Sequence, residues 1–239
     1  MIVIIIVILL ILSVLTFSLP SLLGSSVSLN KKIKVFSWNV CWESMAGKPG
    51  WKLCNQNTSK QICINNAKAV IKNVQPCDFI ALQEYSDSLF SSVSGMSTLV
   101  SQSGHEKMLT AWNKKYTLRQ SYKDEFSVGR PFQILIFDDI IFINVHPGHQ
   151  QEFIRKINKI KNYLQNINLS KYKIIMAGDF NMKMPLSILN MHTQSIQNTC
   201  CYPNYFQQYD YIFSSTQPSL STVSAPKLSS DHKPVVATI

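Results

Sequence analysis

KIIMAGDFN, residues 173–181, has the pattern of a buried strand followed directly by polar side chains. The apolar run over 173–177 predicts a strand inside a sheet. Asp179 and Asn181 come where this strand would end, so a rigid sheet would hold them open to solvent. The stretch therefore predicts an α/β domain that carries functional groups on the loops beyond its strands.

The same arrangement, an apolar run with a polar cluster after it, recurs along the chain. The clusters are Ser37-Trp38-Asn39, Leu82-Gln83-Glu84, Asn144-Val145-His146 and Ser230-Asp231-His232. Another, Tyr209-Asp210-Tyr211, places its carboxylate at the start of a predicted strand. Taken singly, each cluster is typical of an ordinary turn. Taken together they indicate a site, because a chain with only 13 acidic residues places Glu84, Asp179, Asp210 and Asp231 in these positions.

Apolar patterns predict the remaining elements. We expect strands at 33–38, 78–82, 132–137, 140–145, 209–214 and 234–239, and weaker strands near 107–111 and 116–122. Helices are expected at 62–73 and at 152–167, the second because its apolar residues recur at helical spacing. The Ser-rich stretch 86–104 gives little structural signal. Strands that alternate with helices and hairpins predict a mixed α/β fold in which two sheets pack together.

Residues 1–30 carry no charged side chain, and residues 1–17 are almost unbroken Ile, Val and Leu. The apolar stretch is close to the roughly 20 residues that a helix needs to span a membrane. A cleaved signal is the rival interpretation, because Gly24, Ser25 and Ser26 are small residues of the kind found at cleavage sites. We therefore predict an anchor or signal segment with its linker over 1–30 and a catalytic domain over 31–239, either membrane-associated or secreted.

The charge indicates a class of partner, and the cysteine spacings bear on metal sites and disulfides. The chain has 23 basic and 13 acidic residues and a formal net charge of +10, which favours a nucleic acid or an acidic membrane surface. We expect no obligate protein partner. The cysteine spacings fit no zinc pattern. A disulfide between Cys54 and Cys63 and free buried thiols both remain open.

Phosphodiester hydrolysis needs the residue types that the clusters contain. A hard cation must offset charge on the phosphoryl oxygens, and Mg²⁺ prefers carboxylates and water, so Glu84 is a suitable ligand. The reaction also needs a base to deprotonate water and donors for the developing charge. Side chains of these kinds are Asp179, Asn181, His146 and His232.

This ordered set resembles the endonuclease/exonuclease/phosphatase superfamily, which includes deoxyribonuclease I. The resemblance covers residues 33–239 and depends on Trp38-Asn39, Leu82-Gln83-Glu84, Gly178-Asp179-Phe180-Asn181 and Ser230-Asp231-His232-Lys233-Pro234. It implies a four-layer α/β sandwich, with two packed mixed sheets flanked by helices and the site at one edge of the sheets.

The resemblance also implies metal ligands. Glu84 would bind the catalytic Mg²⁺ or Mn²⁺, with Asn39 and Asp231 close to the metal. Some nucleases of the superfamily carry an Arg shortly after this Glu, whereas here Tyr85, Ser86 and Asp87 follow it. The substrate contacts of those nucleases are therefore not expected to carry over.

Catalytic roles follow from the same resemblance. Asp179 would position and activate the attacking water, and Asn181 and His146 would bind the scissile phosphate. His232 would donate to the phosphate, oriented and kept protonated by Asp210.

The leading functional prediction is a Mg²⁺-dependent phosphodiester hydrolase that acts on nucleic acid by in-line attack of water. A sphingomyelinase-type phospholipid phosphodiesterase or an inositol phosphatase is the alternative, favoured by the apolar segment. A third hypothesis, from another class, is a catalytically inactive module that binds polyanions. Metal-dependent turnover would exclude that module.

Overall fold

The fold was obtained as a computed structural model that describes residues 32–43, 60–148, 151–202 and 204–239. The predicted anchor or signal segment and Cys54 lie outside these ranges, so membrane association and secretion stay predictions. Within the described ranges, no helix is both long and apolar enough to cross a bilayer.

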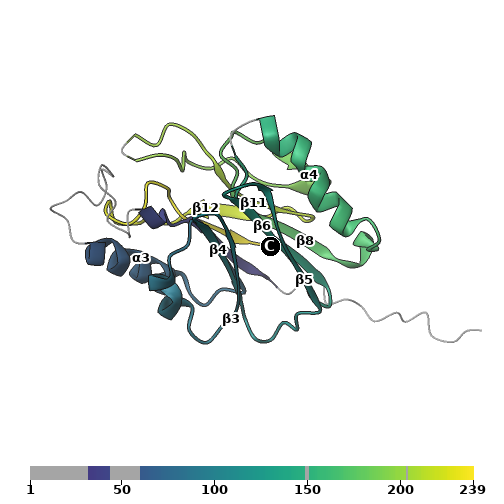
Figure 1. The fold of residues 1–239 in the computed structure, drawn as a ribbon, viewed down its shortest axis with the longest axis horizontal. Helices are drawn as coiled ribbons and strands as arrows, with labels where there is room; N and C mark the ends of the chain where they lie inside the picture. Colours follow the sequence, from purple (N-terminus) through teal and green to yellow (C-terminus); the bar gives the residue numbers. More distant parts are fainter. Residues whose placement is uncertain (1–31, 44–59, 149–150, 203) are drawn as a thin grey trace, which may run out of the picture. The chain divides into compact units, whose positions relative to one another are not determined.

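Two mixed sheets form the centre of the fold (Figure 1). The six-stranded sheet has the order β12 (Ser219–Thr222), β13 (Val235–Thr238), β1 (Lys34–Asn39), β2 (Phe79–Gln83), β4 (Glu106–Trp112) and β3 (Ser97–Ser103). The seven-stranded sheet has the order β5 (Gln120–Ser127), β6 (Arg130–Ile136), β7 (Ile140–Val145), β8 (Lys173–Asp179), β11 (Asp210–Ser214), β10 (Met191–His192) and β9 (Ser187–Ile188).

Two helices cover the outer faces of the sheets (Figure 1). Helix α3 (Lys60–Val74) packs its apolar face, including Ala67 and Ile71, against the six-stranded sheet, and it ends just before Pro76, where a helix is disfavoured. Helix α4 (Gln151–Leu164) packs Ile160 against the seven-stranded sheet. The predicted four-layer sandwich is confirmed.

One apolar cluster lies between the two sheets. Phe79 of β2 stacks on Phe142 of β7, with ring centroids 4.7 Å apart and an interplanar angle of 9°. Val35 and Ile175 are fully buried in the same cluster. The apolar strands that the sequence predicted therefore form the inner layers, because each must bury two faces.

A chain of buried polar side chains crosses from one sheet to the other. The amide of Gln83 donates to Oδ1 of Asn144 at 2.8 Å, and the Asn144 amide donates to Oγ1 of Thr110 at 3.1 Å. Thr110 in turn donates to Oε1 of Gln133 at 2.6 Å. Buried hydrogen bonds of this kind favour one arrangement of the two layers, because any slip would leave polar groups unsatisfied.

Most predicted elements are confirmed, with small shifts. The helix predicted to end at residue 167 ends at Leu164, although Ile167 still packs against the core from the following turn. The weak strand expected near 116–122 begins later, at Gln120. The unassigned Ser-rich stretch contains the 3-10 helix η1 (Asp87–Val93) and β3, and the short strands β9, β10 and β12 were not predicted.

The structure contains both disulfide-bonded cysteines and free buried thiols, and the pairing of Cys63 with Cys54 stays a prediction because Cys54 lies outside the described residues. Cys200 and Cys201 are bonded to each other, Cys63 is disulfide-bonded, and Cys41 and Cys77 are buried free thiols. The vicinal pair was not predicted from the sequence.

Parallel pairing brings the polar clusters to one edge of each sheet. Strands β1 and β2 are parallel, and Asn39 pairs with Gln83. Strands β7 and β8 are also parallel, and Val145 pairs with Gly178. The residues that follow these strands therefore emerge side by side.

Antiparallel neighbours contribute their first residues to the same edge. Strand β11 runs opposite to β8, so Asp210 at its start pairs with Asp179 at the end of β8. Strand β13 runs opposite to β1, and Val235 pairs with Ser37. His232, just before β13, is thereby placed beside the end of β1.

Gly178 permits the close approach of β8 to β7 immediately before Asp179. A Cβ atom at this position would overlap the carbonyl oxygen of Val145, which belongs to rigid strand backbone. We expect Gly178→Ala to lower the free energy of unfolding by roughly 1–3 kcal/mol, as overpacking of a dense interior does. Denaturant unfolding measures this loss. An unchanged midpoint would contradict the close approach of β8 to β7 at Gly178.

Candidate active site

The turns that carry two of the predicted site residues have unusual backbone conformations. Glu84, directly after β2, has φ of 48°, and Asn181, two residues after Asp179, has φ of 53°. Left-handed conformations are uncommon for residues other than glycine and are concentrated at functional sites. Here they turn the chain sharply at the strand ends.

Asp210 and His232 form a buried carboxylate–histidine pair. Oδ2 of Asp210 lies 2.8 Å from Nδ1 of His232, and both side chains are almost inaccessible to solvent. Burial disfavours the charged imidazole, but Asp210 and Asp179 outweigh it and hold the pKa of His232 well above its ordinary value. The indole of Trp38 donates to the His232 carbonyl at 2.9 Å, which fixes the backbone of this residue.

Asp179 lies between two imidazole rings. Its Oδ2 is 3.6 Å from Nε2 of His146 and 3.6 Å from Nε2 of His232, and it accepts a 3.0 Å hydrogen bond from the amide of Asn39. Burial raises the pKa of Asp179 to about 6, although His232 acts in the opposite direction. The carboxylate is therefore a stronger base than an exposed aspartate.

Glu84 forms the other end of the same cluster. Its Oε1 accepts a 3.0 Å hydrogen bond from the Asn39 amide and lies 3.9 Å from Nε2 of His146. Burial raises the pKa of Glu84 to about 8, and the negative charges of Glu106 and Asp231 add to the effect. The placement of Asp231 close to a bound metal stays a prediction.

The two asparagines act in different ways in this structure. Asn39 bridges Glu84 and Asp179 through its amide group, while its Oδ1 accepts from the Cys41 backbone at 3.0 Å. Asn181 donates its backbone N–H to Oδ1 of Asp179 at 2.8 Å and its side-chain amide to the carbonyl of Pro147 at 3.0 Å. Asn39 as a direct metal ligand stays a prediction.

Two residues of the cluster, Glu106 and Arg130, were missed by the sequence analysis. Oε2 of Glu106 lies 4.0 Å from Nδ1 of His146, and Nη1 of Arg130 lies 2.9 Å from its Nε2. Arginine stays protonated in proteins, so Nε2 is the acceptor and a neutral His146 carries its proton on Nδ1. His146 therefore sits between a fixed cation and a carboxylate.

The donor set fits a hard divalent cation. Glu84, Glu106 and His146 bring ligand atoms within 4.8 Å of one another, and so do Asp179, Asp210 and His232. Burial is the main cause of the raised pKa of Glu84, and repulsion by the grouped Glu106 carboxylate adds to it. A bound cation would offset this repulsion, and oxygen ligands are those that Mg²⁺ and Mn²⁺ prefer.

Every site residue predicted from the sequence lies in this one region. Buried carboxylates beside fixed imidazoles, at the edge of a two-sheet sandwich, are the groups that a hydrolase of phosphate esters needs. The profile of the Endonuclease/Exonuclease/phosphatase family matches residues 36–232, and the chain belongs to this family. The predicted family, fold and enzyme class are confirmed.

A relative from a mimivirus matches most of this chain with half of its own length. "Uncharacterized protein L684" of Acanthamoeba polyphaga mimivirus is 30% identical in an alignment 251 residues long that takes in 86% of this chain and 50% of that protein. The chain thus spans about half the length of this curated relative.

Solved structures share the fold at low sequence identity. TDP2 of Caenorhabditis elegans has a TM-score of 0.64 and 17% identity, covering 87% of this chain and 74% of that one. TDP2 of D. rerio, complexed with a single-strand DNA product, has a TM-score of 0.64 and 14% identity, covering 87% and 99%. ANGEL2, a 2',3'-cyclic phosphatase, has a TM-score of 0.68 and 15% identity, covering 87% and 94%. At these identities the likeness shows the fold.

Proposed function

We propose that this protein hydrolyses phosphodiester bonds in nucleic acid with the help of a divalent cation, by in-line attack of water. The observation that carries the proposal is the position of Asp179, a buried carboxylate that lies 3.6 Å from each of two imidazole nitrogens. A base flanked by the protonated His232 on one side and by His146 with its Arg130 partner on the other is the arrangement that this reaction needs.

Asp179 is the group that receives a proton from water. Its pKa of about 6 lies closer to neutral pH than that of an exposed aspartate, so it is a better base while still ionised at pH 7. Its Oδ1 is fixed by the Asn181 backbone, which aims the carboxylate. Asn181 itself presents its amide beside the site and donates to the scissile phosphate.

His232 donates to the phosphate as an imidazolium. Asp210 holds Nδ1 at 2.8 Å, so Nε2 faces the reaction site with a proton. On the other side, Nε2 of His146 accepts from Arg130, and His146 becomes the second donor once this nitrogen is protonated and Arg130 contacts the phosphate. Both rings are nearly inaccessible to solvent, which strengthens their interaction with an anion.

Glu84 would hold the cation, with Asn39 and Asp231 beside it. When bound, Mg²⁺ or Mn²⁺ offsets the negative charge of the phosphoryl oxygens. The chain's own contribution is a fixed carboxylate, since Asn39 donates to Glu84 at 3.0 Å and restricts its rotation.

Charge and structural likeness support nucleic acid as the substrate. The formal net charge of +10 attracts a polyanion over a distance. The D. rerio TDP2 structure contains a single-strand DNA product on the same fold. The phospholipid alternative was motivated by residues 1–30, which lie outside the described ranges.

The direct test assays the full chain in mild detergent with Mg²⁺ against single- and double-stranded DNA, RNA, 5′-tyrosyl DNA, 2′,3′-cyclic phosphate ends, sphingomyelin and inositol phosphates. We expect turnover of a nucleic-acid substrate. Turnover of sphingomyelin or an inositol phosphate alone would overturn the proposal, as would no turnover of any substrate by folded protein.

Removal of the proposed metal ligand tests the cation separately. We expect Glu84→Gln to weaken Mn²⁺ binding, followed by electron paramagnetic resonance, by about 10-fold or more, because a neutral amide is a poor ligand for a hard cation. The control is Asp138→Asn, which removes an exposed carboxylate paired with Arg119 and should leave Mn²⁺ affinity unchanged. Equal affinity of Glu84→Gln and the unmodified protein would refute the assignment.

A further inference from the structure

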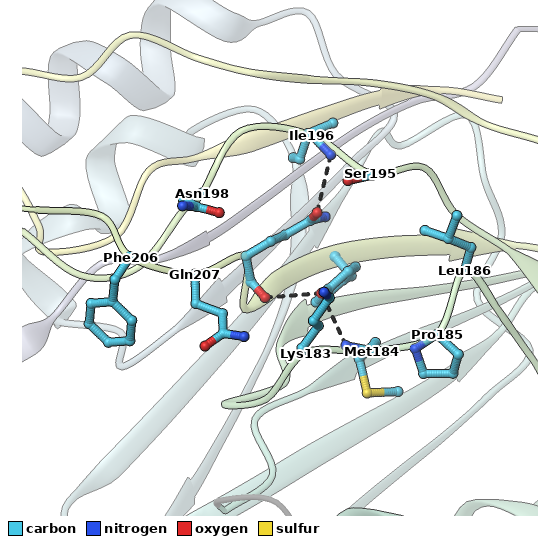
Figure 2. A pocket seen from close by; sticks show the side chains of 11 residues that line it. Lys183, Met184, Pro185, Leu186, Ser195, Ile196, Asn198, Phe206 and Gln207 are labelled. Atoms are coloured by element: carbon cyan, nitrogen blue, oxygen red, sulfur yellow. Dashed lines mark hydrogen bonds between the residues drawn. The ribbon is translucent and has the colours of Figure 1, made fainter.

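A pocket of about 490 Å³ lies between two segments that adjoin site residues in the sequence (Figure 2). One wall is the segment that follows Asn181, with Lys183, Met184 and Pro185, and the other is the loop that leads into Asp210. Figure 2 shows Phe206 and Gln207 on one side of the pocket and Met184, Pro185 and Leu186 on the other. Both walls are therefore direct continuations of the segments that carry the site.

Hydrogen bonds hold the floor of the pocket in place. The hydroxyl of Tyr211 accepts from the Met184 backbone at 3.0 Å and donates to the Gln208 carbonyl at 3.0 Å. Oε1 of Gln208 accepts from the backbone of Ile196 at 3.1 Å. These bonds, drawn in Figure 2, tie three segments of chain together, so the pocket exists before any ligand arrives.

The wall with Phe206 is also tied to the catalytic histidine. The backbone of Gln207 donates to the carbonyl of Cys200 at 3.0 Å, and Cys200 forms a β-bridge with His232. Next to it, the N–H of Lys233 donates to the carbonyl of Thr199 at 2.8 Å. A group in the pocket would thus lie at a fixed position relative to a phosphate bound at His232.

The lining is suited to a flat, polar and uncharged or anionic group. Phe206 is 61% exposed, and Tyr209 contacts its ring at 6.0 Å and 90°, which leaves ring surface open. The amides of Asn198 and Gln207 offer both donors and acceptors, and Lys183 adds a positive charge. No acidic side chain occurs among the described residues that line the pocket. Its volume falls within the range of small-molecule sites.

We infer that this pocket binds the base of a nucleotide adjacent to the scissile phosphate, with Phe206 as the stacking residue. Every base offers a π-face to an aromatic ring, and its edges carry the donors and acceptors that side-chain amides complement. The inference rests on the proposed function and adds to it a substrate class, single-stranded nucleic acid with an unpaired base at the site.

The test is a double-mutant cycle in which Phe206 is changed in the protein and one base is removed from the substrate. The full chain, as unmodified protein and as Phe206→Ala, is assayed with Mg²⁺ on a single-stranded oligonucleotide and on matched oligonucleotides that lack one base beside the cleaved bond. We expect Phe206→Ala to lower kcat/KM roughly 5- to 100-fold on the complete strand, as loss of one base–aromatic stack does. On the oligonucleotide that lacks the stacked base, the two proteins should have equal kcat/KM.

Two further variants serve as controls. Phe206→Trp keeps an aromatic ring and should restore most of kcat/KM. Phe90→Ala removes another exposed phenylalanine, 53% accessible and located in η1, and should change nothing.

The outcomes separate this inference from the proposed function. Cleavage of nucleic acid with the same Phe206→Ala effect on complete and base-lacking strands would overturn the base site and leave the proposed function standing. No cleavage of nucleic acid by the unmodified protein would overturn both. Turnover of sphingomyelin that depends on Phe206 would assign the pocket to a lipid headgroup instead.

Discussion

Asp179→Asn is expected to lower kcat on nucleic acid by about 1000-fold or more while the protein stays folded. The change removes the proton acceptor but keeps the shape of the side chain, and general-base catalysis contributes about 10²–10⁴-fold. Single-turnover kinetics with saturating Mg²⁺ measure the loss in the chemical step. A variant that retains a tenth of the activity would exclude Asp179 as the base.

The stability of the same variant provides its control. Folding raises the pKa of Asp179 from 3.8 to about 6, so the ionised carboxylate costs folding free energy once the pH exceeds its ordinary value. We therefore expect Asp179→Asn to have an equal or higher Tm at about pH 8 without divalent cations. A large fall in Tm would mean that the activity loss reflects unfolding.

Asp210→Asn is expected to lower kcat by about 100-fold or more. The asparagine can still contact Nδ1 of His232, but it supplies no negative charge, so the imidazole loses the interaction that keeps it protonated. Nuclear magnetic resonance of the histidine ring should show a lower pKa for His232. An unchanged His232 pKa would contradict the role assigned to this carboxylate.

The pH dependence of stability gives an independent check on Asp210. A histidine whose pKa is raised by folding stabilises the native state below its unfolded value of 6.5, and this contribution is lost as the pH rises through the folded pKa. The unmodified protein should therefore exceed Asp210→Asn in Tm most strongly at about pH 6. The difference should narrow in alkaline solution.

The inner strands were predictable because each buries two faces. The runs that became β2, β7 and β8 are mostly apolar, and the structure places them in the centre of the sheets. Strands β3 and β12 lie at sheet edges and are rich in serine. Their backbone hydrogen bonds come from a neighbouring strand, so no apolar pattern in their own sequence marks them.

The site was predictable to the extent that its residues follow apolar runs. Asn39, Glu84, His146 and Asp179 all stand at or just after the end of a strand, and the structure brings them together. Their convergence depends on strand order, which local patterns do not contain. The superfamily resemblance supplied that information.

Glu106 and Arg130 were missed because they begin their strands. Strand β4 is antiparallel to β2, so its first residues reach the edge where Glu84 lies, and the N–H of Tyr85 donates to the Lys107 carbonyl at 2.8 Å. Strand β6 is likewise antiparallel to β7, which brings Arg130 to His146. Both residues stand at the start of a strand that runs antiparallel to a strand whose end carries a predicted site residue.

The buried polar chain through Gln83 and Asn144 joins the two sheets, and the proposed activity depends on this docking because each sheet carries part of the site. The six-stranded sheet and its flanks supply Asn39, Glu84 and His232, while the other sheet supplies His146 and Asp179, so neither half holds a complete reaction centre. A nascent or partly denatured chain with correct secondary structure but undocked sheets would leave phosphate esters intact. The proposed activity would therefore require that the two sheets have already docked.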